Sequence, residues 1–298
     1  MTIVVILGSS GMLGSAITEV LTSKLGKIIE VNRSGISVVN GNECMAIDAA
    51  EKQDFAQFFD GLRIDYIVNA IGMIKQVINE SNPSDLQKAQ AINCDFVSAL
   101  NQYSESREVP VIQIGTDCVF SGARGNYVES DMFEATDVYS KTKIAGELNS
   151  PSSMILRTSI IGREVKSSHS LLEWILSQER NSQVNGFINH FWNGITTYHF
   201  ANLVSGIIES KGFLSGTFHV IPSGTISKYE LLKSITANFQ RPDLIINKFQ
   251  APISIDRTLA TLNPAFNSQI WARAGYDIIP SIEDMVSEYA NWLIRPRF

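Results

Sequence analysis

The sequence predicts an α/β fold: a Rossmann-type, doubly wound parallel sheet with a smaller, discontinuous α/β substrate domain toward the C-terminus. Three observations support this prediction. The chain opens with the apolar, β-branched run Thr2–Leu7, typical of a central strand that is buried on both faces. A glycine-rich turn, Gly8–Gly14, follows it directly. Strand-like and helix-like segments then alternate as far as about residue 162.

Composition narrows the classes of protein that remain. The chain has 298 residues, 44% of them apolar, which suffices for one large or two unequal domains. A net charge of −6 and the lack of a Lys/Arg run argue against a nucleic-acid-binding surface. No apolar stretch reaches about 18 residues, so we expect no membrane span. The spacing of Cys44, Cys94 and Cys118 suits neither a metal site nor a disulfide, which fits a reducing cytoplasm, and we expect a monomer or homodimer.

The first strand and its glycine turn predict a dinucleotide site. A helical pattern over Ser15–Leu25 follows the turn, and strand, glycine turn and helix are the context that such a site requires. Glycines permit close approach of a pyrophosphate, and the helix N-terminus offers free N–H groups to it. A purely structural turn is the alternative. The candidate cofactor residues here are Gly8, Ser10, Gly11, Met12 and Leu13.

The end of the second strand, Lys27–Val31, bears on the choice between NAD and NADP. An acid at this strand end usually binds the ribose of NAD, whereas an arginine accommodates the 2′-phosphate of NADP. Glu30 lies inside the strand, and Asn32, Arg33 and Ser34 follow it. These three residues therefore favour NADP, with NAD possible and a solvated loop arginine as the alternative.

Two further strand ends supply candidate cofactor contacts. The third strand, Glu43–Ile47, is followed by Asp48, which could accept from an adenine amine or cap a helix over Ala49–Phe59. The fourth strand, Asp65–Val68, leads into a loop and then a long helix through Tyr103. Small residues after this strand would let the backbone lie against a cofactor. The candidates from this region are Ala49, Asn69, Ala70, Ile71 and Gly72, together with Asn93 inside the long helix.

The fifth strand, Val111–Ile114, carries the chemical groups. Ligands bind outside the C-terminal ends of such strands, which places Thr116 beside the crevice. A helix over Asp137–Ala145 presents Tyr139 and Lys143, four residues apart, on one face. Addition of hydride to a ketone builds charge on oxygen, which a phenol and a hydroxyl can stabilise. We expect the Lys143 cation to lower the pKa of Tyr139 and to hold the nicotinamide ribose; an ordinary surface helix is the alternative.

These motifs give the chain a specific resemblance. Residues 115–122, Gly-Thr-Asp-Cys-Val-Phe-Ser-Gly, are similar to the TDxVFxG signature of the dTDP-4-dehydrorhamnose reductase family of extended short-chain dehydrogenases/reductases. Residues 69–72, 139–143 and 156–162 add to the resemblance, which is strong over residues 1–162. It implies an oxidoreductase of carbohydrate biosynthesis that reduces the 4-keto group of a nucleotide-linked deoxysugar with NADPH. It also implies that Thr116, Tyr139 and Lys143 are catalytic, that Gly8, Gly11 and Gly14 form the cofactor turn, and that Thr158 lies at the nicotinamide.

Cys118 leaves open whether the protein only reduces its substrate or also epimerises it. The related nucleotide-sugar dehydratases carry a Glu at this position, so a Cys counts against dehydration. In the similar GDP-fucose synthases a Cys near this strand end acts in epimerisation, so Cys118 could make the protein a combined C3/C5 epimerase and reductase. It would need a partner, for which His190 is the first candidate and His169 the second. The simpler alternative is a small residue packed under the sugar.

The remaining chain carries candidate substrate contacts. The segment 185–194 is aromatic and amide-rich, so His190 and Trp192 could contact a base or sugar from a loop, or form part of an aromatic core. Lys75 and Arg257 could bind a diphosphate or be solvated charges. With Asp117 and Cys118, these residues complete the predicted substrate set.

The second half of the chain predicts a docked substrate domain. A helix over Phe200–Lys211 and a strand over Gly216–Ile221 form a last crossover of the first domain. A helix Leu171–Arg180 is expected before this crossover. After it we expect a capping box Ser227–Glu230 that opens a helix Tyr229–Phe239, a strand Leu244–Phe249 and a helix Ile282–Leu293. The cofactor domain is thus expected at 1–162 plus 195–221, and the nucleotide-sugar domain at 163–194 plus 222–298.

A non-catalytic function is the third possibility. A member of the resembled family serves as a regulatory subunit of methionine adenosyltransferase and uses the fold to bind a partner. The intact set of Thr116, Tyr139 and Lys143 argues against this function here, although fold alone does not determine activity.

Overall fold

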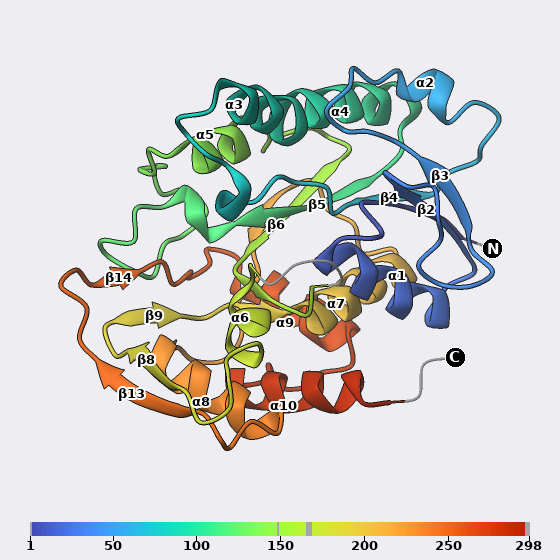
Figure 1. Ribbon diagram of the computed structural model, residues 1–298. Helices are drawn as coiled ribbons and strands as arrows, with labels where there is room; N and C mark the ends of the chain where they lie inside the picture. Colours follow the sequence, from blue (N-terminus) through green and yellow to red (C-terminus); the bar gives the residue numbers. More distant parts are fainter. Residues whose placement is uncertain (1, 148, 165–168, 296–298) are drawn as a thin grey trace.

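The central layer of the molecule is a seven-stranded parallel sheet. The structure is a computed structural model that describes residues 2–147, 149–164 and 169–295. Its sheet has the order β11-β6-β5-β4-β1-β2-β3 (Figure 1), which is the Rossmann order with one strand added beyond β6. The predicted fold class is therefore confirmed. The strands are β1 (Ile3–Leu7), β2 (Lys27–Asn32), β3 (Glu43–Ala46), β4 (Tyr66–Asn69), β5 (Val111–Thr116), β6 (Ser153–Thr158) and β11 (Gly216–His219).

Helices cover both faces of this sheet. Helices α2 (Phe55–Phe58), α3 (Pro83–Gln90), α4 (Phe96–Arg107) and α5 (Val138–Ala145) lie on one face, and α1 (Met12–Lys24), α7 (Thr197–Glu209) and α9 (Pro264–Arg273) lie on the other (Figure 1). Alternate residues of β1 serve the two cores, because successive side chains of a strand point to opposite faces. Val4 and Ile6 pack with α1 and α7, whereas Val5 and Leu7 pack with α2 and α4.

The long helix predicted through Tyr103 contains a wide turn. Between α3 and α4 lies a π turn, η2 (Ala91–Asp95), and Asn93 sits within it. Its amide nitrogen donates to the Met73 carbonyl and to the Thr142 hydroxyl, both at 3.1 Å, and its oxygen accepts from the Met73 N–H at 2.8 Å. Such turns recur at functional sites. Here the turn lets one buried amide tie the β4 loop to α5.

Two predicted helices are shorter than expected. Of the helix expected over Ala49–Phe59, only Phe55–Phe58 is helical, and its N-cap is Asp54. Asp48, the predicted cap, instead accepts the N–H of Ala50 and closes a turn of its own. The helix expected over Leu171–Arg180 ends at Leu176, as α6 (Leu171–Leu176).

A further helix was not predicted at all. Helix α9 begins with a proline in its first turn and packs against α7. The indole N–H of Trp271 donates to the Ile221 carbonyl at 2.9 Å. This contact fixes the helix beside the end of the β11 segment.

The remaining elements form two small sheets with their own helices. One sheet has the order β12-β9-β14, and the other pairs β13 with β8; strands β7 and β10 form a two-residue bridge beside them. The segment 185–194, expected as a loop, thus lies largely in strands. The predicted capping box at Ser227 is confirmed, as is the helix at the C-terminal end. The elements are β7 (Ile160–Ile161), β8 (Gln183–Phe187), β9 (His190–Trp192), β10 (Ile195–Thr196), β12 (Ile226–Ser227), α8 (Lys228–Asn238), β13 (Ile245–Phe249), β14 (Ile255–Asp256) and α10 (Ile282–Leu293).

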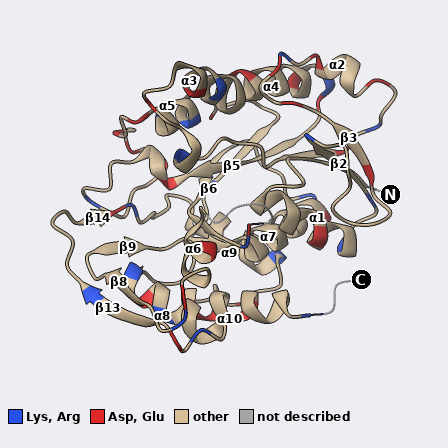
Figure 2. Cartoon of the chain, in the orientation of Figure 1, with Lys and Arg blue, Asp and Glu red and all other residues tan. Residues whose placement is uncertain are grey.

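The distribution of strands agrees with the expected division of the chain, which stays a prediction. All strands of the seven-stranded sheet lie within 1–162 and 195–221, whereas β8, β9 and β12 to β14 lie within 163–194 and 222–298. Charged residues of both signs are interspersed along the chain (Figure 2). Among the described residues, none of the helices has the length and apolar character needed to cross a membrane.

Candidate active site

The glycine turn after β1 has a shape that only glycine permits at two positions. Gly8 has φ +85°, in the left-handed region that favours glycine, and a Cβ on Gly14 would lie 2.0 Å from the Gly8 carbonyl oxygen. Gly11 is the N-cap of α1 and provides no capping side chain, so the N–H groups from Met12 and Leu13 onward receive no side-chain acceptor from it. Ser10 precedes this cap and is half-buried. The turn therefore presents an uncapped helix N-terminus, which is suited to a phosphate.

The end of β2 shows why the acid in this strand is not a ribose ligand. The buried Glu30 carboxylate accepts from the backbone N–H of Val38 and of Val39, at 2.8 and 3.1 Å, so it is committed to the loop that follows. Asn32 is also committed, because its amide donates to Ser9 Oγ at 2.9 Å and accepts from Ser34. Asn32 thus orders the loop, while Arg33 is exposed at the strand end.

The ends of β3 and β4 complete the floor beside the glycine turn. A Cβ on Gly8 would lie 3.1 Å from the Ala70 carbonyl, which brings the two strand ends together. The Asn69 oxygen accepts the N–H of Ile71 at 3.1 Å, but its amide nitrogen is buried and has no hydrogen-bond partner in the described part of the chain. Buried amide groups are normally bonded, so this donor points to a ligand. From β3, Ala49 is buried and Asp48 is exposed.

Helix α5 brings the predicted phenol and ammonium to the end of β5. Its N-cap, Asp137, accepts the N–H of Ser140 at 3.0 Å, and the Ser140 hydroxyl donates to the Cys118 carbonyl at 2.7 Å. These bonds hold the first turn of the helix, and so Tyr139, against the residues after β5. Lys143, one turn further, donates to the Ile114 carbonyl at 3.3 Å.

Thr116 completes the group at the end of β5. It is 8% exposed, and its hydroxyl accepts the Cys118 N–H at 3.2 Å. The same hydroxyl donates to Asp117 Oδ1 at 3.4 Å, and it lies close enough to the Tyr139 phenol to act on the pKa of that group. On the neighbouring strand β6, Thr158 pairs with Thr116 and is buried. The structure therefore brings Thr116, Tyr139 and Lys143 together.

The electrostatics of Tyr139 differ from the expectation. Burial raises the pKa of the phenol, Cys118 adds to this effect, and the nearby Thr116 hydroxyl opposes it. Burial lowers the pKa of Lys143, against an opposing effect of Glu147. The predicted fall of the Tyr139 pKa toward neutrality is therefore wrong for this state of the protein. The phenol keeps its proton at neutral pH, as a proton donor must.

The surroundings of Cys118 do not favour a thiolate. Burial raises the pKa of the thiol to about 12, and the neighbouring Asp117 adds to the rise. The structure does not bring the predicted partner into this group. His190 lies in β9, where its ring bonds with the Ile253 carbonyl at 3.1 Å and packs on Phe187. His169 is exposed at the start of the α6 segment.

The predicted substrate residues lie on both sides of the β5 end. Lys75 forms an ion pair of 3.0 Å with Asp137, the N-cap of α5. Arg257 donates from Nε to the Phe120 carbonyl at 3.0 Å. The Trp192 indole is buried and donates to Ser159 Oγ at 2.9 Å, directly after Thr158.

Sequence reasoning missed one cation at this place, Lys228. Its ammonium lies 5.2 Å from the centre of the Trp192 ring, and it acts electrostatically on Asp117. One sequence signal was available. Lys228 is the first residue of α8, where the positive end of the helix dipole disfavours a cation. A lysine at such a position suggests a purpose other than stability of the helix.

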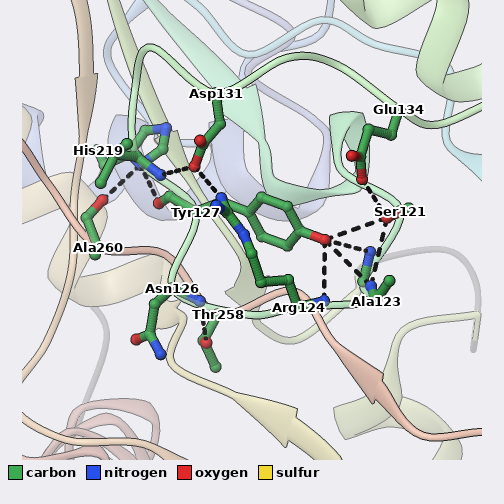
Figure 3. Close-up of polar contacts among 12 residues, drawn as sticks. Ser121, Ala123, Arg124, Asn126, Tyr127, Asp131, Glu134, His219, Thr258 and Ala260 are labelled. Carbon is green, nitrogen blue, oxygen red and sulfur yellow. Dashed lines mark hydrogen bonds and ion pairs between the residues drawn. The ribbon is translucent and has the colours of Figure 1, made fainter.

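The loop after Phe120 is held by one buried tyrosine. The Tyr127 hydroxyl accepts N–H groups from Gly122, Ala123 and Arg124 at 3.1 to 3.3 Å (Figure 3). Its ring stacks on Phe120 with a centroid distance of 4.4 Å. The backbone of Tyr127 also pairs with Thr258 and Ala260. The loop is thereby attached to the segment that carries Arg257.

The glycine turn and the group of Thr116, Tyr139 and Lys143 together define a class of protein. It is a dinucleotide-binding α/β fold with a hydroxyl, a phenol and an ammonium at the end of its fifth strand. Comparison with known families identifies the particular family. Residues 1–272 match the RmlD substrate binding domain family, and the chain belongs to it. The resemblance predicted from the motifs is confirmed.

Curated relatives of the chain are mainly named reductases. The probable low-salt glycan biosynthesis reductase Agl14 of Haloferax volcanii is 23% identical over 231 residues, which cover 74% of each chain. The dTDP-4-dehydrorhamnose reductase of Escherichia coli is 25% identical over 83% of this chain and 82% of its own. A different kind of relative is subunit beta of methionine adenosyltransferase 2 from Pongo abelii, 26% identical over 52% of this chain and 49% of its own.

Solved structures share the whole fold at low identity. A dTDP-4-dehydrorhamnose reductase from Clostridium acetobutylicum superimposes with a TM-score of 0.76 at 20% identity, over 99% of this chain and 100% of its own. The enzyme of that name from Bacillus anthracis, in complex with NADP, gives 0.76 at 18% identity, over 97% and 99%. WbmG of Bordetella bronchiseptica, in complex with NAD and UDP, gives 0.74 at 15% identity, over 97% and 93%.

Proposed function

We propose that the protein reduces the 4-keto group of a nucleotide-activated hexose with NADPH, in the biosynthesis of a deoxysugar. One observation carries the proposal: the Thr116 hydroxyl and the Tyr139 phenol are neighbours at the C-terminal end of β5, and the Lys143 ammonium is bonded to the Ile114 carbonyl of the same strand. The glycine turn after β1 opens at the same edge of the parallel sheet. The names of the curated reductases support this substrate class.

The residues at this edge fit a dinucleotide. Gly8 and Gly14 leave a turn that added Cβ atoms would obstruct, and the unpaired amide of Asn69 offers a donor beside it. The pyrophosphate would bind at Gly11, Met12 and Leu13, with Ser10 beside it. Exposed Arg33, with Ser34, would bind a 2′-phosphate and thus favour NADP; the complex of WbmG keeps NAD as the alternative. The residues proposed along the rest of the cofactor are Asp48, Ala49, Ala70, Ile71, Gly72 and Thr158. Asn32 and Asn93, whose side chains are bonded within the protein, would order the loops beside it.

The chain's own side chains would then handle the proton. A bound nicotinamide supplies the hydride. Tyr139 donates its proton to the oxygen that becomes the new hydroxyl, and Thr116 donates a hydrogen bond to the same oxygen. Lys143, anchored on the Ile114 carbonyl, holds the ribose and places positive charge behind the phenol. The protonated state of Tyr139 suits this direction of reaction.

The substrate would lie between the β5 end and the small sheets. We assign its contacts to Asp117 and Cys118 after β5 and to Lys75, Trp192 and Arg257 around them, with His190 at the margin. Trp192 offers an aromatic surface, and the guanidinium of Arg257 can bind a phosphate in fork geometry. The proposed division into a cofactor domain and a nucleotide-sugar domain follows from this arrangement.

Replacement of Tyr139 by Phe tests the proposal. Purified protein is mixed with NADPH and a panel of 4-keto-6-deoxyhexoses linked to dTDP, UDP or GDP, and the loss of NADPH absorbance is followed. We expect turnover with at least one sugar, a loss of roughly 100-fold or more in Tyr139→Phe, and NADPH affinity that stays close to wild type. Tyr66→Phe, at the opposite end of β4, is the matched control. Turnover that survives Tyr139→Phe would contradict the assignment.

The regulatory alternative rests on the relatives named methionine adenosyltransferase 2 subunit beta. It predicts that the protein oxidises no NADPH with any member of the panel and forms a stable complex with a methionine adenosyltransferase catalytic subunit. Size-exclusion chromatography of the two proteins together distinguishes the two functions.

Epimerisation through Cys118 is not part of the proposal, because burial keeps the thiol protonated. Reduction in heavy water checks this point. We expect no Cys118-dependent deuterium at C3 or C5 of the sugar, and incorporation that disappears in Cys118→Ser would restore the bifunctional alternative.

A further inference from the structure

Lys228 is placed beside the reaction site by contacts between distant segments. Strand β12 ends directly before it and pairs with β9, where Ile226 is opposite Trp192. The Lys228 ammonium lies over the Trp192 ring at 5.2 Å, and Trp192 is bonded to Ser159 at 2.9 Å. Ser159 follows Thr158, which pairs with Thr116 across β6 and β5. A cation of the small sheet region is thus fixed at the strand end that carries the proposed catalytic residues.

The charge of Lys228 is not neutralised locally. Across the described segments, no carboxylate lies within ion-pair distance of its ammonium. Its ionisable neighbours are Asp117, Cys118 and Arg257, and the second cation at Arg257 repels it. Burial and this repulsion lower the pKa of Lys228 to about 8, while Asp117 and Cys118 oppose the shift.

The balance of charge points to an anionic ligand. Asp117 is the carboxylate of this group; burial raises its pKa, and the two cations Lys228 and Arg257 oppose that rise. Two cations therefore face one acid at this place. The ammonium also opposes the dipole of α8, so its position does not stabilise that helix.

We propose that Lys228, together with Arg257, binds an anionic oxygen of the nucleotide sugar next to the reacting ring. This inference rests on the proposed function and adds a specificity residue to it. Two parts of the substrate could supply the oxygen: the diphosphate, or a carboxylate carried by the ring itself. Both would be recognised by the same charge-assisted hydrogen bond.

Calorimetric binding to Lys228→Met tests the inference without reliance on turnover. Methionine keeps an unbranched stem over Trp192 and removes the charge. The ligands are dTDP, UDP and GDP, then UDP-glucose and UDP-glucuronic acid. Lys233→Met is the matched control, since Lys233 is exposed five residues further along α8. Lys228→Arg tests rescue by a second cation.

We expect Lys228→Met to weaken binding by about 10- to 100-fold, as for loss of a hydrogen bond to a charged group. A loss that already appears with the diphosphates assigns Lys228 to the diphosphate. A loss confined to UDP-glucuronic acid assigns it to a ring carboxylate. Affinities equal to those of Lys233→Met for every ligand would overturn the inference.

The pH dependence of wild-type binding provides a readout that needs no variant. The anion binds the protonated lysine, so affinity should be constant below pH 8 and fall above it, by up to about tenfold per pH unit. Cys118 titrates well above this range, because burial raises the pKa of its thiol to about 12. A flat profile from pH 7 to 9.5 would count against Lys228.

The test also separates this inference from the proposed function. Tyr139→Phe should bind the ligands normally but lack turnover, which supports the reductase regardless of Lys228. Wild-type protein that binds none of the ligands contradicts both proposals, whereas binding that does not depend on Lys228 contradicts only this one.

Discussion

Two glycine-rich loops of this protein reach the same edge of the sheet by different means. The turn Gly8–Gly14 is held by its own backbone and by the neighbouring strand β2: the Gly11 N–H donates to the Gly8 carbonyl at 2.9 Å, and the Gly8 N–H donates to the Val31 carbonyl at 2.8 Å. The loop after β5, residues 121–134, is held by its own Tyr127 hydroxyl and also by residues far away in sequence. Its backbone bonds to Asp256, Thr258 and Ala260.

The difference shows what each loop requires of the rest of the chain. The bonds of the first turn come from its own strand–turn–helix unit and from the strand that follows it. The second loop lies where the proposed cofactor and substrate regions meet, and its shape depends on the segment that brings Arg257. We therefore expect changes in the segment around Arg257 to disturb the second loop more than the first.

Gly14→Ala should have the largest effect. The new Cβ would lie 2.0 Å from the Gly8 carbonyl oxygen. Because this oxygen belongs to the backbone, no change of side-chain rotamer can relieve the clash. We expect destabilisation of about 3 kcal/mol, as for severe overpacking, and loss of measurable NADPH binding. Urea unfolding and NADPH titration measure the two effects. The comparison variant is Gly61→Ala, where the added Cβ has open space and only the left-handed φ of +70° should cost stability, about 1 kcal/mol.

Gly125→Ala tests the second loop in the same way. Here φ is +76°, and the Cβ would lie 2.3 Å from the Asp256 carboxyl, so we expect about 2 kcal/mol of destabilisation. Binding of nucleotide sugars should weaken while NADPH binding is kept. The double variant Gly125→Ala/Asp256→Ala should recover part of the stability. If the single variant instead lost NADPH binding first, the two loops would not be independent.

Tyr127→Phe sharpens the comparison, because it removes one oxygen and leaves the stacked ring in place. Three backbone N–H groups would lose their acceptor, with an expected cost of about 1–2 kcal/mol. Thermal and urea unfolding provide the measurement, with Tyr66→Phe as the control. A variant as stable as wild type would show that solvent replaces the hydroxyl.

The smallest expected effect is a pH dependence of stability. Burial lowers the pKa of His219, which contacts the backbone of Tyr127 and Ala260, and Arg157 adds to this effect. The unfolded state then binds the proton more readily, so stability is complete above pH 6.5 and falls as pH drops below it. The slope is at most about 1.4 kcal/mol per pH unit for this group.

His199 acts in the same direction from α7, where burial also lowers its pKa. In His219→Gln, the free energy of unfolding, measured in urea at pH 5 to 8, should therefore depend less steeply on pH than in the wild type. It should still fall at low pH, because His199 remains. An unchanged slope would assign the whole effect to other groups.

The sequence by itself determined the parts of this protein whose geometry is local. The β-branched run with its glycine turn, the strand ends that carry Thr116 and Asn69, and the four-residue spacing of Tyr139 and Lys143 each follow from backbone periodicity or from the steric freedom of glycine. The dinucleotide fold and the proposed catalytic group could be predicted for this reason.

Only the tertiary structure decided what depends on burial and on contacts between distant segments. It turned the expected aromatic loop at 185–194 into strands, revealed that the Tyr139 pKa rises where a fall was expected, and placed Lys228 over Trp192. Burial and pairing between strands leave no periodic pattern in the sequence from which they could be predicted. Lys228, for example, lies 36 positions after Trp192. For that reason Lys75, Asp117 and Arg257 could be proposed from the sequence, whereas Lys228 emerged only from the folded chain.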